Sequence, residues 1–143
     1  LPLVTMMARR TLTTAEMNSL HSTPIQIAPA PGANKVALPV GGMVRVDRAS
    51  TNNNNGSINF HYEGLEPSTF GTDSIIHLRR FHSSKTTDGV YNLGGSMPNS
   101  SLYANSLTED VNKAIEVSID AASTTNCFTS VDIFLTYQII EIA

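Results

Sequence analysis

The amino-acid sequence predicts an all-β fold, an antiparallel β-sandwich of the jelly-roll type with one short N-terminal helix and an extended N-terminal arm. Several segments alternate apolar and polar residues with a period of two, which is typical of half-buried strands. Gly, Asn, Pro and Ser, the residues that favour turns, separate these segments. Only one stretch carries the signals of a helix start. Short strands with one short helix favour a sandwich or a barrel.

The bulk composition narrows the class of protein. The chain has 143 residues, the size of one domain, and we assign residues 1–12 to the arm and residues 13–143 to a single sandwich domain. Charged residues make up 15% of the chain, against about 25% in most proteins, so other protein chains are expected to cover part of the surface. The formal net charge of −3 supplies no basic field for nucleic acid. Every apolar run is shorter than the ~18 residues of a membrane span.

The N-terminal elements follow from local signals. "LPLVTMM" is apolar and precedes Arg9 and Arg10, whereas a signal peptide places its basic residues first. In "LTTAEMNSL", Thr13 is a helix N-cap and Glu16 completes a capping box. Pro24 restricts this helix to two turns.

The strands are expected where apolar residues share one face. The inward-facing sets are Ile25 and Ile27; Val36, Leu38 and Val40, then Val44 and Val46; Ile58, Phe60 and Tyr62, with Asn59, His61 and Glu63 outward; Ile115, Val117 and Ile119; and Val131, Ile133, Leu135, Tyr137 and Ile139.

The connector "APAPGANK" admits three interpretations: a phosphate loop, a linker or a corner between strands. Pro29 and Pro31 lack the N–H groups that a phosphate loop needs, and Val36 stands where a hydroxyl residue would follow Lys35. Strand patterns on both sides leave little length for a linker, so a stiff turn is favoured. The polar segment 83–110 is predicted to be a long loop, and such loops are usually functional or packed on a neighbour.

The side chains that carry chemistry form no pattern of a known site. His61, His77 and His82 lack metal-ligand spacing, and no G-x-S-x-G motif is present. The single cysteine, Cys127, forms no intrachain disulfide and is expected to be buried. We therefore expect no enzyme, no catalytic residue, no cofactor, no metal and no small-molecule substrate.

The segment from Thr13 to Val40, "TTAEMNSLHSTPIQIAPAPGANKVALPV", resembles the start of a class of small tailed-phage virion proteins. The shared pattern is a short helix ending in Leu, then T-P, alternating apolar residues, P-A-P-G-A and a strand after Lys. The C-terminal "NKAIEVSID" and "VDIFLTYQII" are similar in outline, whereas residues 52–105 carry no matching motif. The resemblance covers about half of the chain.

The resemblance implies a structural protein of a bacteriophage virion, most of all a capsid decoration or cement protein on the head surface. It implies a homotrimer that binds the major capsid protein, made in the bacterial host cytoplasm. The alternatives are a tail, collar or fibre component, and a carbohydrate-binding module. The residues expected to contact partners lie in the arm and in the long loop: Leu1, Leu3, Val4, Arg9, Arg10, Tyr91, Leu93, Leu102 and Tyr103.

Overall fold

A computed structural model describes residues 4–49, 58–64, 76–78, 89–92, 111–119 and 127–142. Its elements, in chain order, are β1 (Val4–Thr13), α1 (Thr14–Ser19), β2 (Ile25–Ala28), β3 (Lys35–Arg48), β4 (Ile58–Tyr62), β5 (Ile76–Leu78), β6 (Gly89–Asn92), β7 (Ile115–Ile119) and β8 (Phe128–Glu141).

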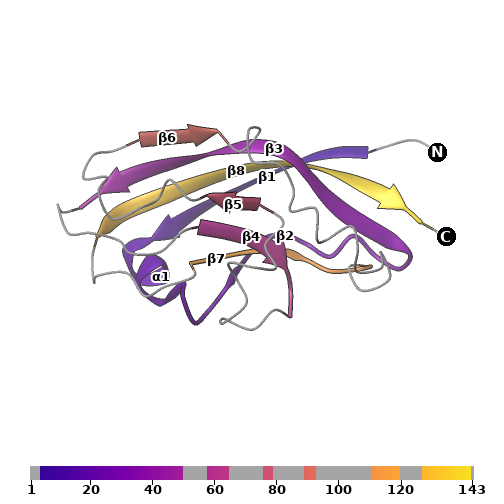
Figure 1. Ribbon diagram of the computed structural model, residues 1–143, viewed down its shortest axis with the longest axis horizontal. Helices are drawn as coiled ribbons and strands as arrows, with labels where there is room; N and C mark the ends of the chain where they lie inside the picture. Colours follow the sequence, from indigo (N-terminus) through magenta and orange to yellow (C-terminus); the bar gives the residue numbers. More distant parts are fainter. Residues whose placement is uncertain are drawn as a thin grey trace.

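The strands form two four-stranded sheets that lie one above the other (Figure 1). Sheet A has the order β1-β8-β3-β6, and sheet B has the order β2-β7-β4-β5. All the strand pairs are antiparallel. The predicted all-β sandwich with one short helix is confirmed. Strand β6 lies within the segment expected to be one long loop.

Strand β1 comes from the segment that the sequence suggests is an arm. Residues 4–12 are extended, as expected, but they are bonded into sheet A, because Val4 to Thr13 pair in unbroken register with Ile139 to Ser130 of β8. Apolar residues without strong alternation do not reveal such pairing, since the partner strand lies more than 100 positions away in the sequence.

The inner faces of the two sheets enclose the core. The predicted inward set of β8 is confirmed, because Val131, Ile133, Leu135 and Tyr137 are all buried. Ile115, Val117 and Ile119 of β7 face them from sheet B and are also buried. The Tyr62 hydroxyl of β4 donates a hydrogen bond of 2.7 Å to the carbonyl oxygen of Ala37 in β3, and this bond joins the two sheets. Cys127 is buried, as predicted.

Strand β3 contains a bulge that overturns one predicted face. The register with β8 shifts between Pro39 and Gly41, so Val40 has no residue opposite it. One extra residue exchanges the two faces of a strand. As a result Ala37 and Pro39 point into the core, and Val40, which was predicted to point inward, is exposed.

The "APAPGANK" segment is a corner between the two sheets. The chain leaves β2 in sheet B and enters β3 in sheet A through this segment. The predicted turn is confirmed, and the structure shows that the chain passes from one sheet to the other there. Gly32 and Asn34 both have positive φ angles, of 106° and 61°. The Asn112 side chain accepts a hydrogen bond from the Gly32 N–H, and the Asn112 N–H donates to the carbonyl oxygen of Lys35. These bonds tie the corner to the segment before β7.

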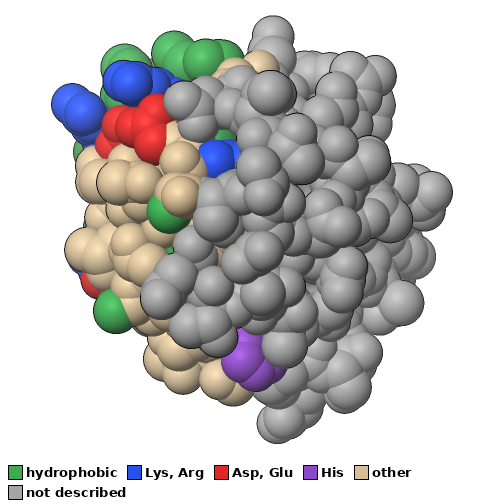
Figure 2. Space-filling model, turned by 90° about the vertical axis from the view of Figure 1, so that its left-hand side faces the viewer, with side chains coloured by type: hydrophobic (Ala, Val, Ile, Leu, Met, Phe, Trp, Pro, Cys, Tyr) green, Lys and Arg blue, Asp and Glu red, His purple; other side chains and the backbone are tan. Residues whose placement is uncertain are grey.

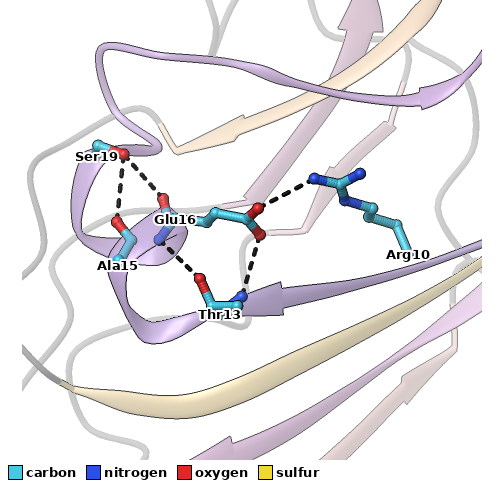
Figure 3. Close-up of polar contacts among 5 residues, drawn as sticks. All are labelled: Arg10, Thr13, Ala15, Glu16 and Ser19. Atoms are coloured by element: carbon cyan, nitrogen blue, oxygen red, sulfur yellow. Dashed lines mark hydrogen bonds and ion pairs between the residues drawn. The ribbon is translucent and has the colours of Figure 1, made fainter.

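Helix α1 begins with the predicted capping box (Figure 3). The Thr13 hydroxyl accepts a hydrogen bond from the Glu16 N–H, and the Glu16 carboxylate accepts one from the Thr13 N–H. The same carboxylate lies 3.1 Å from the Arg10 guanidinium. Met17 is buried and anchors the helix against the core.

Substitution Thr13→Ala is expected to lower the free energy of unfolding by about 1 kcal/mol, because it removes the acceptor for the Glu16 N–H. Thr5→Ala, on the exposed part of β1, is the matched control and is expected to change the stability by less than about 0.5 kcal/mol. Urea unfolding followed by circular dichroism measures both values. Equal losses in the two variants would show that the cap does not stabilise this short helix.

Candidate functional site

The outer face of sheet A is the candidate functional site, and we define it by rows of side chains that run across the strands. One row holds Val90, Arg45, Asp132 and Thr11; the next holds Met43, Phe134 and Arg9; a third holds Gly41, Thr136 and Met7. On β3 and β8 the residues between these rows, Val44, Ile133 and Leu135, point into the core. This face therefore comes from alternate residues of four strands.

Large apolar side chains are exposed on this face. Met7 is 80% exposed, Val90 is 65% exposed and Met43 is 44% exposed. Val40 at the bulge is exposed too. Contiguous exposed apolar residues on a folded protein mark sites of interaction. In Figure 2, which views the molecule from the end where β3 terminates, hydrophobic side chains line the upper border beside clustered charged ones.

The charged groups of this face are paired within the chain. Asp132 lies 3.8 Å from the Arg9 guanidinium and accepts a hydrogen bond from the Thr11 hydroxyl. Arg45 lies 3.5 Å from Asp47. The Arg9 guanidinium is also stacked over the Phe134 ring, 4.9 Å from its centroid. The face thus presents an apolar area beside a balanced polar cluster, without strong net charge.

The structure separates the partner-contact residues predicted from the sequence. Val4 and Arg9 lie on opposite sides of β1, and Arg10 points away from Arg9 toward Glu16 of α1. Tyr91 belongs to β6, where its backbone pairs with Val44. Leu1, Leu3, Leu93, Leu102 and Tyr103 lie outside the described residues.

Sequence reasoning missed Met7, Met43, Val90 and Phe134 as members of one surface. Phe134 could have been noticed from the sequence, because it is an aromatic residue at a position where the alternation of β8 places polar residues. Met43 and Val90 could not be joined to it without the strand order, which brings β3 and β6 beside β8.

A second group of polar side chains lies on sheet B. His61 was expected to point into solvent, but it is fully buried, as are Asn59 and Ser118. The prediction is wrong because both faces of β4 are covered, although its sequence alternates as in a half-buried strand. His61 Nε2 lies 2.9 Å from Ser118 Oγ, and His61 Nδ1 lies 3.0 Å from the carbonyl oxygen of Tyr62.

This group contains a serine, a histidine and a carboxylate, but its geometry is not that of a hydrolytic triad. His61 Nδ1 is 4.0 Å from Glu116 Oε2 and has the Tyr62 carbonyl as its nearer partner. Ser118 has no exposed surface on which a substrate would be attacked. The hydrogen bonds of His61 satisfy a neutral ring, with Nδ1 donating and Nε2 accepting. A structural role follows from this arrangement.

Burial shifts the pKa values of the two titratable groups in opposite directions. Desolvation lowers the pKa of His61 below its ordinary value of 6.5, and the hydrogen bond to Tyr62 opposes this shift. Desolvation, followed by repulsion from Glu63, raises the pKa of Glu116 above 4.5. The folded protein thus favours the neutral form of each group.

The buried His61 is expected to make the protein less stable in acid. The pKa of His61 in the folded state lies below 6.5. The neutral ring therefore makes its full contribution to the free energy of unfolding above pH 6.5, and this contribution is lost as the pH falls through the folded-state pKa. Glu116 contributes with the opposite sign, since its raised pKa favours the fold at lower pH. Comparing the unfolding free energy of a His61 variant with that of the wild type at each pH isolates the contribution of His61.

Between pH 7.5 and pH 5, His61→Gln is expected to show a shallower fall of unfolding free energy than the wild type. His21→Gln, which changes a histidine in the turn after α1, is the control and should keep the wild-type slope. Urea midpoints at several pH values measure both. If the slope in His61→Gln equals that of the wild type, the buried His61 is not the cause of the loss of stability in acid.

Two further kinds of feature are absent from the described residues. No helix among them is long and apolar enough to cross a membrane. Within the same part of the chain, no group of three or more His, Cys, Asp or Glu side chains is placed to hold a metal ion.

Comparison with known proteins gives a distant similarity to a solved structure. No family model matches the chain, and no curated protein matches it. A solved structure described as the cyanophage Pam1 capsid asymmetric unit contains a similar chain, with 13% sequence identity and a TM-score of 0.47. The alignment covers 95% of this chain and 84% of that chain.

Proposed function

We propose that this protein is a non-enzymatic structural component of a bacteriophage virion, and specifically a capsid decoration or cement protein that binds the outer surface of the head. The observation that carries the proposal is the outer face of sheet A, where Met7, Met43 and Val90 are exposed on a regular four-stranded sheet. The resemblance of residues 13–40 to small phage virion proteins supplies the class of partner.

The proposed mechanism is mechanical. A copy that spans two neighbouring capsomers buries surface against each of them, so separating the capsomers also requires breaking those contacts. A stable interface buries about 800 Å² on each partner. Apolar side chains at the centre with charged groups at the rim match the anatomy of such interfaces. Here Met43 and Phe134 form the centre, while Asp47, close to the end of β3, lies at the rim.

The fold is suited to a protein that resists mechanical force. Strand β8 is bonded over most of its length to β1 on one side and to β3 on the other. A pull on the outer face of sheet A is therefore shared by the backbone hydrogen bonds of three long strands. The homotrimer that the resemblance implies is a separate prediction, which the mass of the purified protein tests.

Phage particles that lack the protein are expected to release their DNA at a lower temperature than particles that carry it. Fluorescence of a DNA-binding dye during heating measures the release. Adding the purified protein to the deficient particles should restore the wild-type release temperature. Identical release temperatures with and without bound protein would overturn the cement function, and failure of the protein to bind heads at all would overturn the head location.

A further inference from the structure

Strand β1 is one of the two edge strands of sheet A among the described strands, and its first half is exposed on both faces. Met7 points outward and is 80% exposed, whereas Val4 and Met6 lie on the core side of the sheet and are still 48% and 39% exposed. Core-side apolar residues are normally covered. An edge strand of this length with exposed apolar residues is a template for pairing with another strand.

The sequence of β1 is self-complementary about Ala8. When the strand is laid antiparallel to a copy of itself with Ala8 opposite Ala8, Thr5 lies opposite Thr11 of the copy, Val4 opposite Leu12, Met6 opposite Arg10 and Met7 opposite Arg9. Every pair then joins residues of the same face, because even-numbered residues face the core and odd-numbered ones face outward.

We propose that the edge of β1 is a self-association site, at which a second copy of this chain pairs antiparallel about a two-fold axis through Ala8. The pairing joins the two A sheets into one continuous eight-stranded sheet. A two-fold contact uses the same patch on both subunits, so the patch must be complementary to itself. The pattern of β1 meets this condition at every position from Val4 to Leu12.

The proposed register covers the exposed core-side residues. The second half of β1 is packed near α1, since Arg10 contacts Glu16 and Leu12 is fully buried. The two-fold axis places the exposed Val4 and Met6 of one copy beside Leu12 and Arg10 of the other. The exposed first half of β1 in each copy thus lies beside the second half of β1 in the other copy, which is packed near α1.

The charges of β1 also permit the contact. Arg9 and Arg10 are already paired with Asp132 and Glu16 of their own chain. In the proposed register neither arginine lies opposite another cation; each lies opposite a methionine, along which its aliphatic stem can pack. Like charges directly opposite would destabilise the strand pair.

The register makes a sharp prediction for disulfide trapping. Residues directly opposite on antiparallel strands have Cα atoms about 4.5–5.5 Å apart, within the range a disulfide needs. Met7 residues of the two copies are two positions out of register, about 8 Å apart, which is too far. Under mild oxidation the full-length Ala8→Cys variant is expected to form a covalent dimer, whereas Met7→Cys, although more exposed, is not.

The wild type, whose only cysteine is buried, should remain uncrosslinked under the same conditions. Non-reducing electrophoresis and intact mass measure the products. A dimer from Met7→Cys that forms as fast as the Ala8→Cys dimer would overturn the register.

A pair of surface variants tests the same contact without relying on position 8. Met7→Arg places a cation opposite the Arg9 of the other copy, at two symmetric positions in the dimer, and Met7→Glu places an anion there. Both variants remove the same exposed side chain. Sedimentation of the purified protein over a range of concentrations is expected to show dimer dissociation that is about tenfold or more stronger for Met7→Arg than for Met7→Glu.

Equal weakening by both variants would indicate a non-specific apolar contact and overturn the proposal. A wild type that stays monomeric at all concentrations would do the same. A protein that forms only trimers would support the homotrimer that the resemblance implies and would also overturn the two-fold pairing of β1. The measurements use the isolated protein, so their outcome is independent of whether it binds a phage head.

Discussion

Gly42→Ala is expected to destabilise the fold by about 3 kcal/mol or more. Gly42 has a φ of 144°, and a Cβ atom there would overlap the backbone carbonyl oxygen of Phe134 in the neighbouring strand. The three nearest atoms all belong to the backbone of Phe134 and Leu135 in β8, so no flexible side chain can move away. Because small domains are stable by only about 5–15 kcal/mol in total, a substantial loss of folded protein follows.

Gly41 provides the matched control for this prediction. A Cβ atom at Gly41 would meet no atom within 4 Å. Gly41→Ala is therefore expected to change the unfolding free energy by less than about 1 kcal/mol. Urea unfolding monitored by circular dichroism compares the two variants. Similar midpoints for both would show that the close approach of β3 and β8 after the bulge is not required.

Loss of head binding by the double variant Met43→Asp, Val90→Asp is the second large effect that we expect. These side chains flank the polar cluster on the outer face of sheet A, and both are exposed, so the fold should tolerate the change. In an apolar contact the two added carboxylates lose their hydration, and Arg45, which lies opposite position 90, offsets this cost only in part because it is already paired with Asp47. Apparent affinity for deficient heads is expected to fall by about 30-fold or more, the effect of losing an interface hot spot.

The double variant Thr23→Asp, Ala30→Asp adds the same two charges at exposed positions. These positions lie just before and just after β2, a strand of sheet B. Its affinity for heads is expected to equal that of the wild type. Co-sedimentation of labelled protein with heads measures both variants. If both variants bind equally well, the outer face of sheet A is not the contact surface.

Local features of the fold could be predicted from the sequence. The capping box of Thr13 and Glu16 involves residues three positions apart, and the inward set of β8 follows from strict alternation over many residues. The corner at "APAPGANK" was also predictable, because Pro and Gly restrict or free the backbone wherever they stand. In each case the physical cause lies within a few residues of the feature.

Features that depend on distant partners could not be predicted in this way. The bulge at Val40 is visible only when β3 is aligned with β8, and it reverses the face of the residues before it. His61 is buried because both faces of β4 are covered, which its own alternation does not reveal. Residues 4–12 are a strand because β8 lies beside them. The candidate surface combines four strands whose order the sequence does not state.

Cryo-electron microscopy of heads that carry the protein tests the central claim most directly. The account predicts density for this sandwich on the outer surface of the head, with the outer face of sheet A turned toward the capsid shell. Density confined to the tail or collar would contradict the proposed location. Density on the head with sheet B against the shell would contradict the proposed contact surface.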